Sequence, residues 1–320
     1  MRNAFAKALI RAATDDPRVV LLTGDHGYAL FDEFRQVCPG QYINAGVAEQ
    51  NMVGVAAGLA KGGLRPVVYG LSAFIPVRVL EQIKLDVCYE ELPVVFVGDG
   101  AGVVYSVLGT SHQSTEDIAV LRALPHLTIL SPADCWEMAA CMEMAFHRGG
   151  PVYLRMGKAD LGEVHSCRPK LMWGEPYSLQ DGDGPLAWIA TGSMVRAAAR
   201  MAANWPGSSV YSAPCLKPVN PDAVAAICRR RRAVITLEEH SVYGGLGSAI
   251  CEVASAHAPT WVCRVGIPDR FSRFCGSYDY LLREHQLDDK SILAQIERFL
   301  AQVPDQGCFR RLDVLGRQAA

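Results

Sequence analysis

The order of hydrophobic and polar positions divides the first half of the chain into short apolar runs and longer segments with helical periodicity. The apolar runs are rich in β-branched residues and predict strands at Val19–Thr23, Pro66–Tyr69, Val94–Val97, Leu127–Leu130 and Val152–Arg155. The periodic segments predict helices at Asn3–Ala13, Ala48–Lys61, Ala73–Tyr89 and Asp134–His147, the last with Asp134 placed to cap it. Alternation of this kind is typical of βα units and a mostly parallel sheet.

The periodicity stops between Leu161 and Gly184, where turn-forming and polar residues predominate. Alternation then resumes, and strands are predicted at Leu186–Ala190, Ser209–Ser212, Ala233–Leu237 and Thr260–Arg264. Helices are predicted between the first two of these strands and at Pro221–Arg229, Leu246–Ala256 and Lys290–Leu300. We therefore expect two three-layer α/β domains, over residues 1–163 and 186–303, with a linker at 164–185 and a weakly patterned tail at 304–320.

Composition narrows the class of protein without identifying it. The 320 residues carry 31 basic and 33 acidic side chains, a formal net charge of −2, so nucleic acid and anionic membranes are not expected partners. No apolar stretch approaches the ~20 residues of a membrane span, and the amphipathic N-terminus does not resemble a signal peptide. The eleven cysteines form no C-x-x-C pair and predict neither a disulfide framework nor a zinc site. We expect a cytoplasmic protein.

The segment from Asn44 to Ala60 is the first with candidate chemistry. Small and apolar residues recur in it with helical spacing, which predicts a buried helix with Glu49 in its first turn. Its buried face is expected to contain Ala48, Met52, Val55, Ala56 and Leu59. An acid in a first turn complements the helix dipole by ~0.3–1 kcal/mol, and periodicity alone favours this structural role for Glu49.

Several longer motifs change that interpretation. GVAEQNMVGVAAGLA at 46–60 is followed by F-x-x-x-R-x-x-E-Q-I from Phe74 to Ile83, by LPVVFVG at 92–98 and by GTSHQSTEDIAVLRALP at 109–125. LEEHSVYGGLGSAICEV at 237–253 and GIPDRF at 266–271 come later in the chain. The first four blocks resemble the pyrimidine-binding domain of the transketolase family, and the last two resemble its C-terminal domain. The resemblance covers about residues 1–300 and implies dependence on thiamine diphosphate.

The resemblance implies cofactor contacts for four residues. Glu49 matches the glutamate that bonds N1′ of the aminopyrimidine, where a carboxylate in a dry site stabilises the protonated ring nitrogen. This favours the imino tautomer, whose exocyclic nitrogen takes the thiazolium C2 proton and leaves a carbanion. Phe74 matches an aromatic residue that stacks on the pyrimidine, Asp25 an acid near the thiazolium, and Arg78 belongs to the same cofactor-binding motif. An ordinary core phenylalanine and a turn aspartate are the alternatives for Phe74 and Asp25.

Three further positions are implied to meet the substrate. His112 matches the family's substrate-binding histidine, whose imidazole bonds substrate oxygens and transfers protons; a loop histidine with satisfied hydrogen bonds is the alternative. Arg155 ends an expected strand and matches an arginine that binds the substrate phosphate. Leu108 stands where transketolases carry an aspartate that meets a donor hydroxyl. Glu49 and His112 are thus the implied catalytic residues.

Other departures from the family pattern also bear on the substrate. The family's phosphate-binding histidine aligns near Gly100 and its phosphate-binding serine near Ala29, so Arg155 is the one matching phosphate contact in this half. Loss of such partners weakens the binding of a phosphate or polyol unless other groups replace them. We expect a substrate other than the standard sugar phosphates, such as a nucleotide-linked sugar or a secondary-metabolite precursor.

The sequence contains no counterpart of the N-terminal transketolase domain, which binds the diphosphate through Mg²⁺. Gly98-Asp99-Gly100 resembles the start of that domain's motif, but no asparagine lies between Asn51 and Asn204 to complete it, and we interpret it as a glycine turn. The resemblance therefore implies one subunit of a split enzyme. An N-terminal partner subunit is expected to supply the diphosphate site and the Mg²⁺ ligands, with the cofactor across the interface of an α2β2 assembly. No metal ligand is assigned to this chain, which is expected to be inactive alone.

Three functions remain open. The leading hypothesis is transfer of a two-carbon ketol unit from a ketose donor to an aldehyde acceptor. The first alternative decarboxylates a 2-oxo acid donor, as in 1-deoxyxylulose-5-phosphate synthase or the β-subunit of 2-oxo-acid dehydrogenases, and Leu108 favours it because pyruvate has no donor hydroxyl. The second alternative is a non-catalytic regulatory subunit. Retention of Glu49, Phe74 and His112 argues against it, since a buried carboxylate without its partner is costly.

Overall fold

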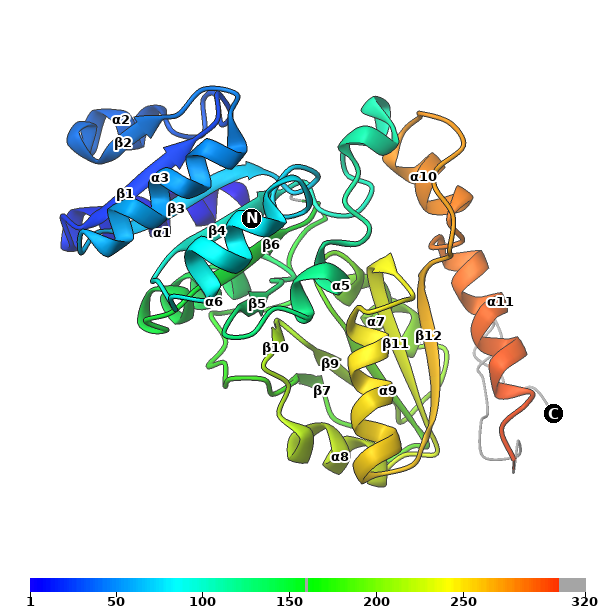
Figure 1. The fold of residues 1–320 in the computed structure, drawn as a ribbon. Helices are drawn as coiled ribbons and strands as arrows, with labels where there is room; N and C mark the ends of the chain where they lie inside the picture. The colour runs from blue at the N-terminus through cyan, green and yellow to red at the C-terminus, as the bar shows by residue number, and fades with distance from the viewer. Residues whose placement is uncertain (159–160, 305–320) are drawn as a thin grey trace.

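The computed structural model describes residues 1–158 and 161–304, which contain two β-sheets covered by helices (Figure 1). The first sheet has seven strands in the order β10–β5–β6–β4–β3–β1–β2. In chain order they are β1 (Val19–Thr23), β2 (Tyr42–Asn44), β3 (Arg65–Leu71), β4 (Val95–Asp99), β5 (Thr128–Leu130), β6 (Val152–Met156) and β10 (Cys215–Lys217). All neighbouring strands are parallel except β10 and β5.

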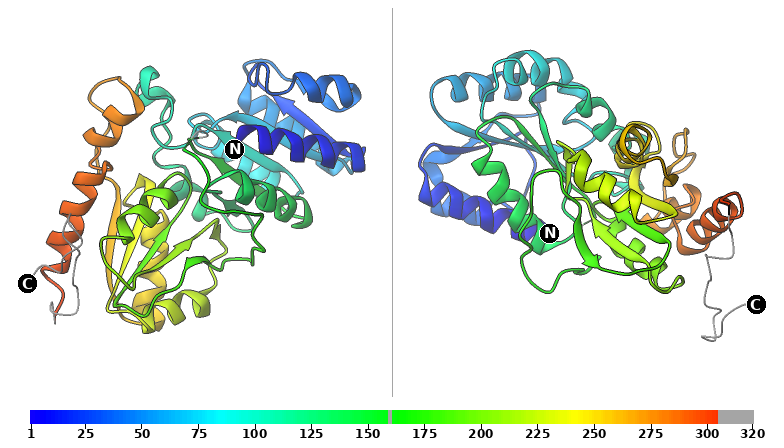
Figure 2. Two further views of the ribbon diagram at one scale, coloured as in Figure 1. Left: turned by 180° about the vertical axis from the view of Figure 1, so that it is seen from behind. Right: turned by 90° about the horizontal axis from the view of Figure 1, so that it is seen from below.

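Helices cover both faces of this sheet (Figure 2). One face packs against α1 (Arg2–Asp15), α2 (Asp32–Val37) and α6 (Cys135–His147). The other packs against α3 (Glu49–Lys61), α5 (Asp117–Arg122) and the helical turns η2 (Val77–Val79), α4 (Leu80–Gln82) and η3 (Ile83–Cys88). Because side chains alternate along a strand, neighbouring strand residues pack against the helices of opposite faces. Leu21 packs on one face of the sheet and Leu22 on the other.

The second sheet has five strands in the order β12–β11–β8–β9–β7. They are β7 (Tyr177–Gln180), β8 (Leu186–Ala190), β9 (Ser209–Ser212), β11 (Ala233–Ser241) and β12 (Trp261–Ile267). One face packs against α7 (Met194–Ala202), α10 (Tyr278–Glu284) and α11 (Asp289–Leu300), and the other against α8 (Pro221–Arg229) and α9 (Leu246–His257). The prediction of two three-layer α/β domains is confirmed.

Three strands were absent from the sequence predictions, and one of them is β2, which pairs parallel with β1. β7 lies within the expected linker, 164–185, and pairs antiparallel with β9. β10 belongs to the second half of the chain but completes the edge of the first sheet against β5. The two halves also share an apolar core, which contains both Phe96 of the first sheet and Ile189 of the second. The expected tail lies outside the described residues beyond residue 304.

Two helix predictions need correction. The segment predicted as one helix over Ala73–Tyr89 is helical only from Val77 to Cys88, where 3-10, α and π turns follow one another. It starts after Pro76, which lacks the N–H and disfavours helix in the residue before it. In α3, Met52 and Ala56 are buried as predicted, whereas Val55 is exposed on the opposite face, together with Gly54 and Gly58. Ala48, the N-cap residue, was also predicted to be buried and is exposed. The cap predicted for α6 is confirmed, because the Asp134 carboxylate accepts from two amides of the first turn.

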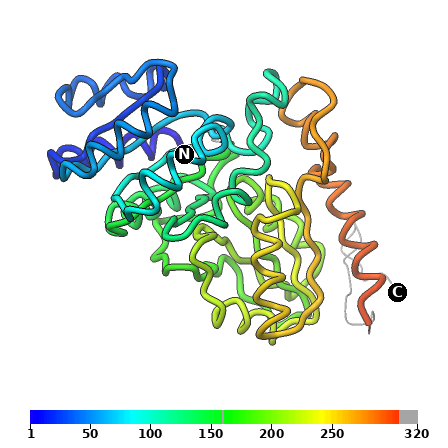
Figure 3. Tube along the Cα trace, in the orientation of Figure 1, coloured from blue at the N-terminus to red at the C-terminus, as the bar shows by residue number. Residues whose placement is uncertain are grey.

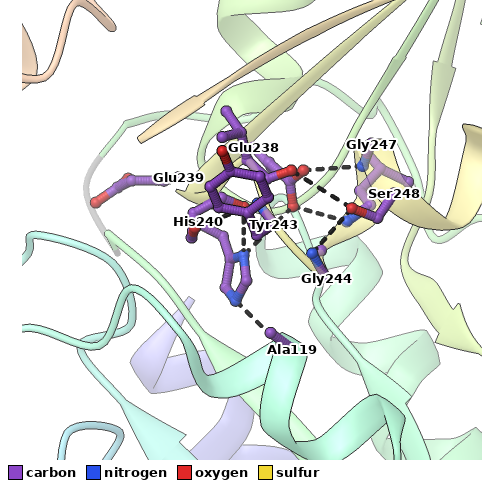
Figure 4. A network of polar contacts seen from close by, with 12 residues as sticks. Ala119, Glu238, Glu239, His240, Tyr243, Gly244, Gly247 and Ser248 are labelled. Carbon is purple, nitrogen blue, oxygen red and sulfur yellow. Dashed lines mark hydrogen bonds and ion pairs between the residues drawn. The ribbon is translucent and has the colours of Figure 1, made fainter. Parts of the chain in front are cut away.

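The carboxyl end of β11 places ionisable side chains where the two halves of the chain meet (Figure 4). Glu238 is buried and its two oxygens accept from the amides of Leu246 and Gly247, at 2.7 and 2.8 Å, at the start of α9. Burial raises the pKa of Glu238 to about 7. Burial also lowers the pKa of His240 to about 4, and its Nε2 lies 3.3 Å from the amide of Ala119 in α5. His240 is therefore neutral near pH 7.

Candidate active site

The predicted cofactor residues lie at the carboxyl edge of the first sheet, where parallel strands of α/β proteins place ligand contacts. Asp25 follows β1, Glu49 begins the helix after β2, Phe74 follows β3 and His112 lies in the long connection after β4. In Figure 3 that connection rises from the body of the molecule beside the segment before α10.

Glu49 is 4% exposed although it is the first residue of α3. Its Oε2 accepts from Arg78 Nη1 at 3.2 Å. Its Oε1 is buried without a hydrogen-bond partner in the described structure. A buried carboxylate oxygen normally has a donor, so this atom is set up to accept a hydrogen bond from outside the chain.

Phe74 connects Glu49 and Arg78 to His112. The Arg78 guanidinium carbon lies 4.0 Å from the centroid of the Phe74 ring, in a cation–π contact. The His112 ring packs edge-on against Phe74, with centroids 5.4 Å apart and an interplanar angle of 63°. The structure therefore brings Glu49, Phe74, Arg78 and His112 together, from three separate segments of the chain.

His112 ends the turn η5 (Thr110–His112), which follows the turn η4 (Ser106–Leu108). Gly109 joins the two turns with φ of 76°, a backbone conformation that suits glycine. The Ser111 Oγ lies 3.0 Å from His112 Nδ1. Leu108 is 49% exposed on the same loop, so its apolar side chain is accessible from outside the chain.

Asp25 is exposed in the turn after β1, with φ of 62°. Its carboxylate accepts from Tyr28 Oη at 2.9 Å, and its amide donates to Asn44 Oδ1 at 3.2 Å. His26, which sequence reasoning missed, has its ring centroid 6.5 Å from that of Phe74 and a buried Nε2 without a partner in the described chain. Its position beside Asp25 at a strand end is the signal that could have found it.

Arg155 does not join this group. It is 2% exposed, and its Nε donates to Asp117 Oδ2 at 2.8 Å while its Nη2 donates to the Glu239 carbonyl at 2.9 Å. Burial opposes the charged form, but the Asp117 carboxylate raises the pKa of Arg155. In this structure the guanidinium binds protein acceptors at the junction of the two halves, and the phosphate-binding role expected for Arg155 stays a prediction.

The Gly98–Gly100 segment ends β4. Asp99 is buried and accepts from Tyr69 Oη at 2.7 Å and from Tyr105 Oη at 3.3 Å. Gly100 has φ of 76°, and a Cβ there would collide with the Tyr105 ring, so the interpretation as a glycine turn is confirmed.

Within residues 1–158 and 161–304, no group of three or more His, Cys, Asp or Glu side chains is arranged to hold a metal ion. No helix of the described chain has the length and apolar character needed to cross a membrane.

Two family models match the chain: "Transketolase, pyrimidine binding domain" at residues 1–163 and "Transketolase, C-terminal domain" at residues 181–292. The chain belongs to the transketolase family. One relative, the 6-deoxy-6-sulfo-D-fructose transketolase subunit SqwH of Clostridium sp. (strain MSTE9), is 34% identical over 92% of each chain. Another, an apulose-4-phosphate transketolase subunit of Phocaeicola vulgatus, is 34% identical over 84% of this chain and 87% of its own. The prediction of a transketolase-like enzyme subunit is thereby confirmed.

Other transketolase relatives are longer. The 1-deoxy-D-xylulose-5-phosphate synthase of Chlorobium luteolum is 34% identical over 93% of this chain, which spans 48% of that enzyme. Among solved structures, a split gene transketolase, an inactive beta4 tetramer, has a TM-score of 0.85 and 32% identity over 94% of this chain and 98% of its own. Transketolase domains imply dependence on thiamine diphosphate, and split subunits imply an N-terminal partner subunit.

Proposed function

We propose that this transketolase subunit transfers a two-carbon ketol unit from a ketose donor to an aldehyde acceptor. Thiamine diphosphate would bind at the interface with an N-terminal partner subunit. The observation that carries the proposal is the buried Oε1 of Glu49, which has no partner in the described structure and belongs to the group that contains Phe74 and His112. A protonated ring nitrogen is the kind of donor that such an oxygen requires.

The residues present fit the aminopyrimidine of this cofactor. Glu49 Oε1 would hold the proton on the ring nitrogen, while Arg78 keeps Oε2 in place through their 3.2 Å contact. Phe74 would stack on the ring, and Asp25 would lie toward the thiazolium. When bound, thiamine diphosphate supplies a carbanion nucleophile at its thiazolium C2.

His112 would serve the substrate rather than the cofactor. Its imidazole can donate to or accept from a substrate oxygen and move a proton there. The nearby Ser111 Oγ, 3.0 Å from Nδ1, limits the rotation of the ring and leaves Nε2 for the substrate. His112 and Glu49 would thus hold protons at two separate places, one on the substrate and one on the cofactor.

We further propose that the partner subunit covers this edge of the sheet and supplies the diphosphate site and the Mg²⁺ ligands. Apolar side chains are exposed on the segments that carry the group, and they include Tyr28, Val47, Val77 and Val107. Exposed apolar surface of this kind marks an interface. The split gene transketolase described as an inactive beta4 tetramer supports the expectation that this chain is inactive alone and assembles as α2β2 with its partner.

The substrate proposed is not a standard sugar phosphate. Leu108 is exposed where transketolases carry the aspartate that meets a donor hydroxyl, and Arg155 is buried with its Nε bonded to Asp117 and its Nη2 to the Glu239 carbonyl. The names of two relatives, which specify 6-deoxy-6-sulfo-D-fructose and apulose 4-phosphate, support a specialised ketose. Normal efficiency with xylulose 5-phosphate and ribose 5-phosphate, measured with the partner present, would contradict this proposal.

Calorimetric titration of thiamine diphosphate with Mg²⁺ tests the function directly. We expect weak binding or none to this chain alone, and tight binding after co-purification with its N-terminal partner. Glu49→Ala should abolish the binding or leave the assembly inactive, because the ring nitrogen loses its acceptor. Tight binding to the isolated chain would contradict the split site, and absence of binding in both samples would favour a non-catalytic subunit.

A second candidate is decarboxylating transfer from a 2-oxo acid. The exposed Leu108 favours it because pyruvate has no donor hydroxyl, and a 1-deoxy-D-xylulose-5-phosphate synthase is 34% identical to this chain. Release of labelled carbon dioxide from [1-¹⁴C]pyruvate by the reconstituted enzyme separates the two reactions. Ketol transfer releases none.

A further inference from the structure

The loop that carries His112 is attached to the C-terminal half of the chain by hydrogen bonds. Ser272 Oγ donates to Gln113 Oε1 at 2.7 Å, directly after His112. Thr110 Oγ1 donates to the Ser272 carbonyl at 3.4 Å, and the amide of Gly276 donates to the Ser106 carbonyl at 3.3 Å. The segment 272–276 therefore runs along the turns η4 and η5, as the neighbouring teal and orange segments show in Figure 1.

Ser272 is itself held by His285, the residue that directly follows α10. The His285 Nε2 lies 2.7 Å from Ser272 Oγ, and His285 is 1% exposed. Burial lowers the pKa of His285, so the ring is neutral near pH 7 and carries one N–H. Since the serine has a single proton, which it gives to Gln113, His285 Nε2–H is the donor to Ser272. The three side chains form a directional chain from α10 to the residue beside His112.

A second contact holds the other end of the same loop. The amide of Val103 donates to Glu239 Oε1 at 2.8 Å, and Tyr278 Oη donates to Glu239 Oε2 at 2.6 Å. Ser193 Oγ also donates to Oε2. Glu239 is buried, so this carboxylate is a fixed acceptor between β11 and the loop. The segment from Val103 to Gln113 is thus fastened at both ends by residues of the C-terminal half.

The contact beside His112 is polar rather than apolar. Gln113, Ser272 and His285 line a cavity of about 30 Å³ between the loop and the C-terminal half, together with Thr110 and Glu116. At the tip of the loop, Val107 and Leu108 are exposed and add little packing. Val103 at the start of the loop is buried in the apolar core of the C-terminal half, but the position of the loop beside His112 depends on hydrogen bonds, which fix direction and distance more closely than apolar contact does.

We propose that Ser272 and His285 are positioning residues for His112, so that the C-terminal half sets the geometry of the substrate side of the active site. The inference rests on the role proposed above for His112. Misplacement of a catalytic side chain by as little as 1 Å can cost roughly 100-fold in rate. The chain His285–Ser272–Gln113 acts on substrate turnover and does not touch the cofactor residues Glu49 and Phe74.

Hydrogen–deuterium exchange on the full chain, without the partner subunit, tests whether Ser272 holds the loop in place. Ser272→Ala should accelerate exchange of the amides in 106–113 by about fivefold or more, because the loop loses its tie to α10. Ser272→Thr, which keeps the hydroxyl, should restore slow exchange. Ser209→Ala is the matched control, because it also removes a buried hydroxyl. This hydroxyl bonds Arg231 and Gly182 at the start of β9, at the end of the second sheet that lies away from the loop. Wild-type exchange at 106–113 in Ser272→Ala would overturn the proposal.

The activity of the complex with its N-terminal subunit tests whether the position of the loop controls substrate turnover. Ser272→Ala should lower kcat by roughly tenfold to 100-fold while the Kd for thiamine diphosphate stays unchanged, and Ser272→Thr should recover most of the rate. An equal loss in Ser209→Ala, or a Kd that rises together with the fall in kcat, would show general structural damage and overturn the proposal. If the wild-type complex has no transferase activity, the proposed function fails, and the exchange measurement alone decides whether the loop is held as described.

Discussion

Two groups of charged side chains differ in how many of their carboxylate oxygens find a hydrogen-bond partner within the chain. At the open edge of the first sheet, Glu49 uses one carboxylate oxygen and leaves the other buried without a partner in the described structure. At the junction of the two halves, Glu238 and Glu239 each use both oxygens within the protein. A buried carboxylate whose oxygens all have partners within the protein stabilises the fold. A buried carboxylate with a free oxygen beside exposed apolar surface is available to bind a ligand. Asp117 Oδ1 at the junction is also buried without a hydrogen bond to the described residues, so the exposed apolar surface beside Glu49, together with its free oxygen, is what distinguishes the two groups.

The largest expected effect comes from the edge of the sheet. Glu49→Gln keeps the shape of the side chain but removes the charge, so transferase activity of the reconstituted complex should fall by about 100-fold to 10,000-fold. The free energy of unfolding of the isolated chain should change little, because the remaining contact is one ion pair with the half-exposed Arg78. Steady-state kinetics and urea unfolding measure the two effects. Full activity with a large loss of stability would place Glu49 among the structural residues.

The junction should respond in the opposite way. Arg155→Met leaves the Asp117 carboxylate buried without its cation and should lower the free energy of unfolding by about 3–5 kcal/mol. Arg200→Ala, which breaks the exposed pair with Asp289, is the control and should cost less than about 1 kcal/mol. Urea unfolding of the three chains provides the measurement. Equal costs for the two variants would remove the distinction between the junction and an ordinary surface pair.

The smallest effect concerns a buried histidine in the segment between the domains. His165 Nδ1 lies 2.9 Å from Asp134 Oδ2 and its Nε2 lies 3.4 Å from Glu137. Burial disfavours the charged ring, but the bond to Asp134 and the charge of Glu137 raise the pKa of His165 above 6.5. The stabilisation by His165 is complete below its unfolded pKa and disappears as the pH rises through the raised value. Between about pH 5.5 and about pH 8.5, wild type should lose about 1 kcal/mol more stability than His165→Gln. Parallel pH profiles of the two chains would contradict this assignment.

Local patterns in the sequence predicted much of the fold. The strands β1 and β8 coincide with the predicted runs, and α3 and α6 begin within one residue of the predicted starts. These elements are buried on one or both faces, so their hydrophobic periodicity is strong. The resemblance to a family also located Glu49, Phe74, Arg78 and His112, which the structure brings together.

Features that depend on distant partners were missed. β10 has three residues and exists because β5 offers it an edge, a pairing that no local pattern encodes. Arg155 ends a strand as predicted, but only the folded chain shows that Asp117 and Glu239 surround it. His26 lacks a motif of its own; its place beside Asp25 at a strand end is a weak signal, and the structure adds its proximity to Phe74.

The strand β10 also determines how the gene can be divided or recombined. Because residues 215–217 complete the sheet that holds the proposed cofactor residues, a cut within 164–185 would separate that sheet from its last strand and expose the edge of β5. An unprotected strand edge is a template for aggregation. A chimaeric enzyme that exchanges only the first 163 residues with a relative would therefore join mismatched surfaces along β5, whereas an exchange of residues 1–303 would carry both sheets and their shared core intact.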